Sequence, residues 1–299
     1  MSLLLMQAIV SGIVTGCVYA LVALSLVIIY KSTDVVNFAG GELVMLGAYI
    51  GLLGIVSFDL PYAVMFALAV AVTFATGAVF ERVTLNTIGG RHYSANADLV
   101  PLVVATVGLG FLLKGLVRVV PYTEEVRRLP PLVAGRPIFF GDVILQRQDL
   151  AIIAVTIVVM AALTLFFTFT RSGKALRATS QNPRAAALVG IPVRLMSMTA
   201  WGLAAALSAV AGILLAPKLL ITPDMGVIVI LALAAAIIGG FTSLPGCVAG
   251  GILLGVIQNL VGIFVSSRAI SLAPFLVIMI VLLVRPQGLL AGKVVAKKV

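Results

Sequence analysis

Glu42 is the acidic residue best placed for chemistry within a membrane, because the stretches on either side of it are almost free of charge. It follows Asn37, Phe38 and Gly41 in a polar, glycine-containing interruption of the apolar sequence. Broken helices at membrane depth often line solute sites, since their exposed N–H and C=O groups can meet charged ends of a solute. We predict that these four residues line a solute path or gate it. The alternative for Glu42 is a cap or an ion pair at a helix end.

No arrangement suited to catalysis accompanies Glu42. The sequence has no GxxxxGK[ST] phosphate loop, no HExxH and no GxSxG, and a single carboxylate is no acid/base pair. His92 is the only histidine, and Cys17 and Cys247 lie in apolar stretches without a CxxC spacing, which is typical of small buried hydrophobic residues. We therefore expect no catalytic residues, no metal site and no cofactor, with energy supplied by a partner or an ion gradient.

Composition places most of the chain in lipid. Of the 299 residues, 62% are hydrophobic and only 10% are charged, against about 45–50% and about 25% in soluble domains. The net charge of +10 would suggest nucleic acid in a soluble protein. Here the cations lie between apolar stretches and are not interleaved with aromatic residues, so we interpret them as determinants of membrane topology.

Apolar stretches recur at spacings that suit membrane-crossing helices of about 20 residues. They cover residues 3–30, 43–57, 60–80, 99–120, 151–170, 195–217, 225–267 and 271–284. The stretch 225–267 is too long for one crossing, and we divide it at the helix breakers of 239–246, where Gly239 and Gly240 are candidates for a gating hinge. The predicted fold is an all-α transmembrane bundle of eight or nine segments, with residues 37–57 and the two halves of 225–267 as candidates for broken or re-entrant segments. Glycines at helical spacing, such as Gly12 with Gly16 and Gly251 with Gly255, and also Gly108, predict close helix packing.

Basic residues predict the orientation. The loop 171–194 carries five of them and the tail 293–298 carries three lysines, so both are expected on the cytoplasmic side. In the loop 121–149 four arginines are balanced by four acidic residues, which suits the outside. No basic residue precedes Lys31, so we interpret the first stretch as a retained membrane helix, with the N-terminus outside, and not as a cleavable signal.

The segment 171–195 predicts two short helices, over 173–180 and 184–189. Asn182 breaks the first, Pro183 suits the first turn of the second, and Gly190 suits a C-terminal cap. Small residues on one side and basic residues on the other would form a docking surface for a protein. The pattern equally fits a basic loop held at anionic lipid.

Residues 173–191, GKALRATSQNPRAAALVGI, resemble the cytoplasmic loop of the permease subunits of branched-chain amino-acid ABC importers. Three further stretches are similar to the same family: VNFAGGE and MLGAY within 36–49, the paired glycines of 237–254, and RPQGL at 285–289. The resemblance covers essentially the whole chain in order. Its length and uncharged first span resemble the shorter of the two paralogous permeases of such importers.

The resemblance implies one permease transmembrane domain over residues 1–299, with an external loop at about 121–149 and a cytoplasmic coupling loop at about 171–195. It implies a path for branched-chain or other small neutral amino acids, formed with a paralogous permease in a bacterial inner membrane, with the C-terminus cytoplasmic. The implied partners are two cytoplasmic ATPase subunits, a periplasmic substrate-binding protein and the lipid bilayer, and no nucleic acid. The implied ATPase-coupling residues are Gly173, Lys174, Arg177, Ala178, Gln181, Asn182, Arg184 and Gly190.

Three alternatives remain at this point. An importer permease for urea or short amides would share the same pattern. A secondary transporter or channel would normally carry intramembrane charges for ion coupling, which are almost lacking here. A scaffold that transports nothing would have no need of a structured basic loop.

Overall fold

The computed structural model describes residues 1–89, 100–119, 128–133, 135–140, 143–241, 243–285 and 287–290. Six helices are long and apolar enough to cross a membrane: α1 (Ser2–Thr33), α3 (Tyr62–Phe80, continued by the π-helical turn Glu81–Leu85), α5 (Val100–Val119), α6 (Arg147–Phe169), α9 (Val193–Leu215) and α11 (Leu244–Phe264). Three apolar helices are shorter: α2 (Gly40–Val56), α10 (Ile228–Gly239, preceded by the 3-10 turn η2, Met225–Val227) and α12 (Ala273–Val284, preceded by η3, Ser267–Ser271). The remaining helices are α4 (Asn86–Gly89), α7 (Arg171–Gln181) and α8 (Pro183–Leu188). The chain is thus a helical, multi-pass membrane protein.

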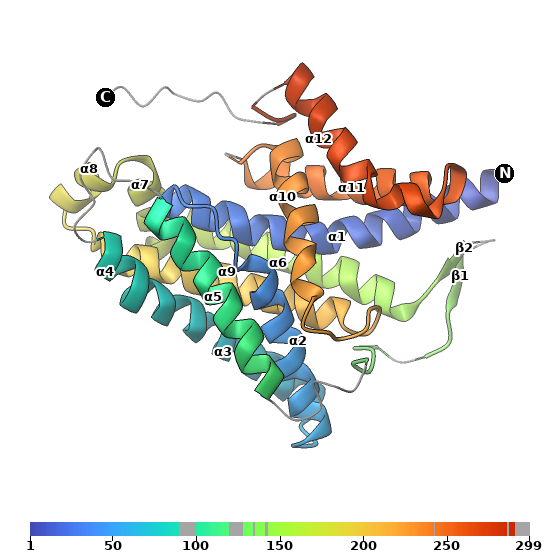
Figure 1. The fold of residues 1–299 in the computed structure, drawn as a ribbon, viewed down its shortest axis with the longest axis horizontal. Helices are drawn as coiled ribbons and strands as arrows, with labels where there is room; N and C mark the ends of the chain where they lie inside the picture. The colour runs from blue at the N-terminus through green and yellow to red at the C-terminus, as the bar shows by residue number, and fades with distance from the viewer. Residues whose placement is uncertain are drawn as a thin grey trace.

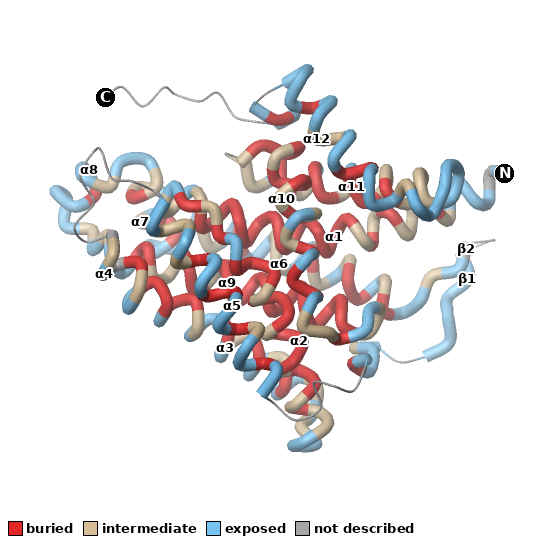
Figure 2. The backbone as a smooth tube through the Cα atoms, in the orientation of Figure 1, coloured by how far each residue is buried: buried red, intermediate tan, exposed pale blue. Residues whose placement is uncertain are grey.

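The centre of the bundle is formed by α1 and α9. The most apolar part of α1 is 89% buried and that of α9 is 83% buried, whereas the same measure is 33% or less for α3, α5, α6 and α11. Figure 2 shows this difference as buried tubes in the middle and exposed ones at the rim. Rim side chains such as Phe111, 72% exposed, are apolar. An apolar rim around a buried centre is what lipid solvation of the bundle requires.

Glycines let α1 and α11 lie against each other, as Figure 1 shows. A Cβ added at Gly12 would lie 2.5 Å from the Cα of Val256, and one at Gly16 would lie 2.5 Å from the Cα of Ile252. The predicted role of these glycines in close packing is confirmed. Gly108 does not take part in packing within this chain, because nothing in the described residues lies within 4 Å of a Cβ at that position.

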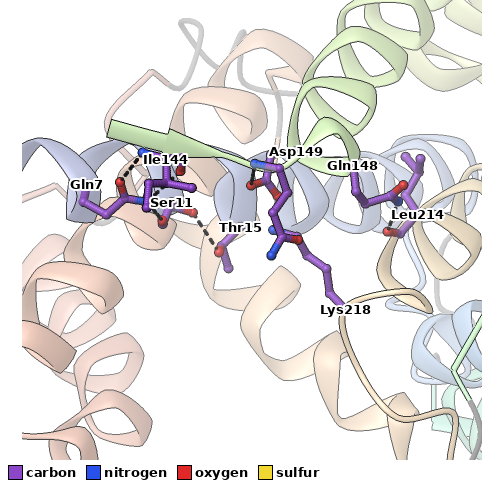
Figure 3. Close-up of polar contacts among 9 residues, drawn as sticks. Gln7, Ser11, Thr15, Ile144, Gln148, Asp149, Leu214 and Lys218 are labelled. Carbon is purple, nitrogen blue, oxygen red and sulfur yellow. Dashed lines mark hydrogen bonds and ion pairs between the residues drawn. The ribbon is translucent and has the colours of Figure 1, made fainter. Parts of the chain in front are cut away.

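One end of the bundle carries a β-hairpin that the all-α expectation did not include. Strands β1 (Ile138–Phe140) and β2 (Val143–Leu145) pair antiparallel. The side chain of Gln7 on α1 holds β2 in place: its Nε2 donates to the carbonyl of Ile144 at 3.0 Å, and its Oε1 accepts from the Ile144 N–H at 3.1 Å (Figure 3). In this way the side chain of Gln7 takes the place of a neighbouring strand. The strands were not predicted because each has only three residues, which is too short for a recognisable sequence pattern.

The start of α6 is fixed at the same end. Asp149 forms an ion pair with Lys218, and the Nε2 of Gln148 donates to the carbonyl of Leu214 at the end of α9 at 3.1 Å (Figure 3). Helices α7 and α8 lie at the opposite end of the molecule (Figure 1). We call these two ends the hairpin end and the α7 end.

Candidate functional site

The break between α1 and α2 is a buried polar turn. Helix α1 ends at Thr33, followed by the C-cap Asp34 with a φ of 54°, and α2 begins at Gly40. Asn37 is 1% exposed, and its Oδ1 accepts the N–H of Ala39 at 3.0 Å. The N–H of Phe38 donates to the hydroxyl of Thr106, in the middle of α5, at 3.3 Å. The predicted interruption of the helix is therefore present, and α5 covers it.

Gly41 permits a backbone contact that no side chain would allow. A Cβ at Gly41 would collide with the carbonyl of Gly226 in η2. This approach brings η2 over the first turn of α2, where Glu42 lies. A Cβ at Gly226 would be 2.7 Å from the Oε1 of Glu42, and one at Gly110 of α5 would be 3.4 Å from its carboxylate carbon. The carboxylate is thus enclosed by η2 and α5, two elements that are far from α2 and from each other in the sequence.

Lys114 of α5 is the cation of this site. Its Nζ lies 3.6 Å from the Oε1 of Glu42 and 3.8 Å from the Oδ1 of Asp224. The Glu42 side chain is 13% exposed, that of Lys114 28% and that of Asp224 76%. The other Glu42 oxygen, Oε2, is buried and has no hydrogen-bond partner within the described structure. A cation between two carboxylates, one enclosed and one exposed, is a place where the charged ends of a small solute could exchange with protein charges.

Sequence reasoning missed two members of this cluster, Lys114 and Asp224. The available signal was Lys114, a charge within an otherwise apolar stretch, since such residues normally have a partner. The ion pair of Glu42 that was considered as an alternative is present. This ion pair lies beside the break, where Phe38 is 44% exposed. Its presence is therefore compatible both with a structural role for Glu42 and with a role in a solute path.

The α7–α8 segment has the predicted two-helix form. The hydroxyl of Thr170 accepts the N–H of Gly173 at 3.0 Å and caps α7, and the Oδ1 of Asn182 accepts the N–H of Ala185 at 3.0 Å and caps α8. Pro183 occupies the first turn of α8 as predicted. Gly190, with a φ of 84°, ends α8: its N–H bonds to the carbonyl of Ala187, and the next N–H bonds to that of Ala186. These are the two bonds of a Schellman cap.

The predicted coupling residues divide into two groups. Gly173 is buried, because a side chain there would meet the carbonyl of Phe166 in α6, and Ala178 is half-buried. These two fit α7 against the bundle. The others are exposed, and with them Leu188 and Val189, which are 89% and 76% exposed at the tip of α8. The exposed predicted residues are Lys174, Arg177, Gln181, Asn182, Arg184 and Gly190.

The predicted break at 239–246 separates α10 from α11. Gly240 has a φ of 96°, and the Ser243 hydroxyl caps α11 by accepting the N–H of Gly246 at 3.1 Å. The C-terminal RPQGL stretch returns to this turn: the N–H of Leu289 donates to the carbonyl of Ile238 at 2.8 Å. A Cβ at Gly288 would lie 2.6 Å from the Cα of Gly240. Two stretches that looked independent in sequence therefore form one structural unit.

In the part of the chain that the structure describes, no group of three or more His, Cys, Asp or Glu residues could hold a metal ion. Both cysteines are free and buried in the core, Cys17 at 5% and Cys247 at 0% exposure. His92 and the tail 291–299, with its predicted topology-determining lysines, lie outside the described residues, as do residues 121–127, 134, 141 and 142 of the predicted external loop.

Comparisons with known proteins agree with this architecture. Residues 8–284 match the family described as the branched-chain amino acid transport system permease component. The chain is 32% identical to the high-affinity branched-chain amino acid transport system permease protein BraD of Pseudomonas aeruginosa, covering 98% of this chain and 97% of BraD. It is 30% identical to the permease protein LivH of Escherichia coli K12, with coverage of 98% and 97%.

A solved structure shares the fold. The chain resembles one in "PsaBC from Streptococcus pneumoniae in complex with Fab", with a TM-score of 0.54 and 15% identity over 95% of this chain and 92% of that one. At this identity the likeness concerns the fold alone. The family match over nearly the whole length shows the family as well as the fold. This chain belongs to the permease components of branched-chain amino acid transport systems.

Proposed function

We propose that this chain is one permease subunit of an ABC importer that takes up branched-chain or other small neutral amino acids through a path shared with a paralogous permease. The observation that carries the substrate class is the Glu42–Lys114–Asp224 cluster beside the buried break, in a chain of which only 10% of the residues are charged. A zwitterion offers one positive and one negative end to such a cluster, and a branched side chain suits apolar surroundings. The substrates named for the relatives, BraD and LivH, are of this kind.

The experiment is uptake by the complete reconstituted complex. Proteoliposomes containing both permeases, the ATPase subunits and the substrate-binding protein are given labelled leucine, alanine or urea, with and without ATP. Leucine uptake that depends on ATP is expected. Faster urea uptake would favour the short-amide alternative, and uptake by the permease without the ATPase would favour a secondary transporter or channel.

We further propose nine crossings, namely the six long spans together with α2, η2–α10 and α12. The N-terminal part lies at the hairpin end, where Gln7 bonds to β2, and Leu290 lines a cavity with Arg177 at the α7 end. The two ends of the described chain, near Gln7 and at Leu290, thus lie at opposite ends of the bundle, which fits an odd number of crossings. Residues 34–39 would re-enter the membrane from the α7 end, so that α2 starts at depth. The positive-inside rule makes the α7 end, with the C-terminus, cytoplasmic in a bacterial inner membrane.

Cysteine labelling tests this orientation. Leu188→Cys on α8 and Phe139→Cys on β1 each place an exposed thiol at one end, while Cys17 and Cys247 are buried. A membrane-impermeant maleimide added to intact spheroplasts should label Phe139→Cys and spare Leu188→Cys. The opposite pattern would refute the orientation and the coupling proposal with it.

The α7–α8 segment is the proposed contact for the ATPase. Its exposed cations, Lys174 and Arg184, could pair with acidic groups, and Leu188 and Val189 offer an apolar tip. An exposed apolar tip on a helix with both ends capped is typical of a protein-binding element and unusual for a plain loop. Arg184→Glu should weaken co-purification of the ATPase, while Arg268→Glu, an exposed cation on η3, should leave it unchanged. Equal retention of the ATPase by both variants would contradict the proposal.

The paralogous permease is proposed to pack on α5. Its outward side has open space above Gly108 and Gly115 and exposes Phe111 and Leu112. Small residues of this kind let a second helix approach closely in lipid. This placement would put the Glu42 cluster next to the interface of the two permeases. Gly239 and Gly240 remain candidates for a gating hinge at the far end of α10.

A further inference from the structure

A cavity of about 440 Å³ lies at the α7 end, between α1, α6, α7 and the start of α11. Its volume is within the range of pockets that enclose small molecules. It is separate from the α2 break and shares no residue with the Glu42 cluster. The greater part of its wall is apolar and consists of Leu24, Ile28, Met160, Leu163, Phe167, Leu176, Ala200, Leu244, Pro245 and Leu290.

Two cations contribute to the same wall. Lys31 comes from the last turn of α1 and Arg177 from α7, and they are close enough for their positive charges to act on each other. Hydroxyl groups of Ser32, Thr164, Thr168, Ser180 and Ser243 complete the polar part, and none of the described residues that line the cavity is acidic. Two like charges held near one another repel. A negatively charged ligand between Lys31 and Arg177 would be attracted by both cations and would offset their repulsion.

The cavity adjoins a surface that faces lipid. Thr164 and Thr168 of α6 line it and are exposed, and their neighbours Leu165 and Phe169 are 56% and 76% exposed. α6 ends at Phe169 and α1 at Thr33, so the cations lie where two membrane helices end. A lipid would meet this geometry with its headgroup at the cations and its chains along the apolar wall.

Leu290 lines the cavity and is the last residue that the structure describes, so the C-terminal tail is a segment that could compete for it. Residues 291–299 contain three lysines and no acidic side chain, so the tail would bring positive charge to two cations. We propose that the cavity binds an anionic phospholipid, with its phosphate at Lys31 and Arg177 and its upper acyl chains against α1 and α6. The lipid would link α7 to α1 and α11, beneath the surface proposed for the ATPase.

Lipid binding to the purified permease pair tests this proposal. The complex is titrated with phosphatidylglycerol, with phosphatidylcholine of the same chains, and with glycerol phosphate alone, and binding is measured by native mass spectrometry. Phosphatidylglycerol should bind most tightly, because attraction to surface cations is worth about a factor of five for each cation. The double variant Lys31→Gln/Arg177→Gln should weaken its binding about 25-fold. The charge-conserving Lys31→Arg/Arg177→Lys should retain it, which distinguishes loss of charge from misfolding.

Arg171→Gln is the matched control, since Arg171 is an exposed cation on α7 that does not line the cavity. It should bind phosphatidylglycerol as the wild type does. Any one of three results would overturn the proposal. The first is equal affinity for phosphatidylglycerol and phosphatidylcholine, and the second is an equal loss of phosphatidylglycerol binding in the control and the double variant. The third is saturation of the site by glycerol phosphate alone.

Discussion

Lys114→Met removes the cation that joins Glu42 to Asp224 while keeping an apolar stem of similar length. In the wild type its Nζ is 3.6 Å from the Glu42 carboxylate and 3.8 Å from that of Asp224. At an effective dielectric constant of about 20, a pair at the shorter distance attracts by about 4–5 kcal/mol before desolvation is counted. Asp224 is 76% exposed, so its pair adds little.

The net effect is smaller than this attraction. Lys114 is 28% exposed, and solvent screens it in part. Glu42, however, is enclosed by Gly110 and Gly226 and has one buried oxygen without a hydrogen bond in the described structure, so it cannot find water easily when the ammonium is lost. Breaking a fully buried pair costs about 3–5 kcal/mol. For this half-buried pair we expect a loss of about 2 kcal/mol in the free energy of unfolding.

Trp201 provides the assay. It is the only tryptophan, it is fully buried, and its ring centroid lies 5.5 Å from that of Phe80, so its fluorescence should change on unfolding. Unfolding of the purified permease by dodecyl sulfate in mixed micelles is compared for the wild type, Lys114→Met, Glu42→Gln and the double variant. Removing the Glu42 charge should relieve most of the loss caused by Lys114→Met, with a coupling of about 1–2 kcal/mol.

Arg118→Met is the control, because Arg118 is an exposed cation one turn further along α5. It should leave the unfolding curve unchanged. The reasoning fails if Lys114→Met is as stable as the wild type, or if the effects of Lys114→Met and Glu42→Gln simply add. Additivity would mean that the Glu42 carboxylate is already satisfied by water and that the cluster is only a surface ion pair.

Three further outcomes are expected. Gly41→Val should destabilise the chain by about 1–3 kcal/mol in the same Trp201 assay, since its side chain would meet Gly226, whereas Gly108→Val, with open space around it, should not. Asn182→Ala should cost about 1 kcal/mol, visible as faster hydrogen exchange confined to α8, and exchange that stays as slow as in the wild type would exclude the cap. Gln148→Leu should cost about 1–3 kcal/mol by leaving backbone groups of Leu132 and Leu214 unpaired, and a stability equal to that of the wild type would mean that water replaces the amide.

The sequence predicted best what depends on neighbouring residues. The caps of α7 and α8 and the turn at Gly190 involve residues three to five positions apart, so their chemistry can be read locally. The bounds of the apolar stretches agree with those of the helices to within a few residues, because the apolar character of a membrane helix is also a local property of the sequence. At 225–267 the glycines and prolines divide the stretch into α10 and α11, as expected from their backbone preferences.

Contacts between distant segments could not be predicted in this way. Lys114 and Asp224 are 72 and 182 positions from Glu42, and nothing local indicates that η2 folds over the start of α2. Gly173 shows the same limit in another form. Its small size suggested a surface for docking a partner, whereas the structure uses it to fit α7 against the carbonyl of Phe166. A small residue indicates a close approach, but not what approaches.

Helix α10 connects the charged cluster to the C-terminal turn. At its start, Gly226 of η2 contacts Gly41 and closes over Glu42, and at its end Gly239 contacts the backbone of Gly246 while Gly240 contacts Gly288. Its 12 residues form a rod of about 18 Å. Because backbone contacts without intervening side chains leave little room for adjustment, a rotation of α10 must disturb both ends together. A hinge at Gly239 and Gly240 would therefore move η2 and so act on Glu42. Under the gating proposal, α10 is the single stiff element that transmits the movement from one end to the other.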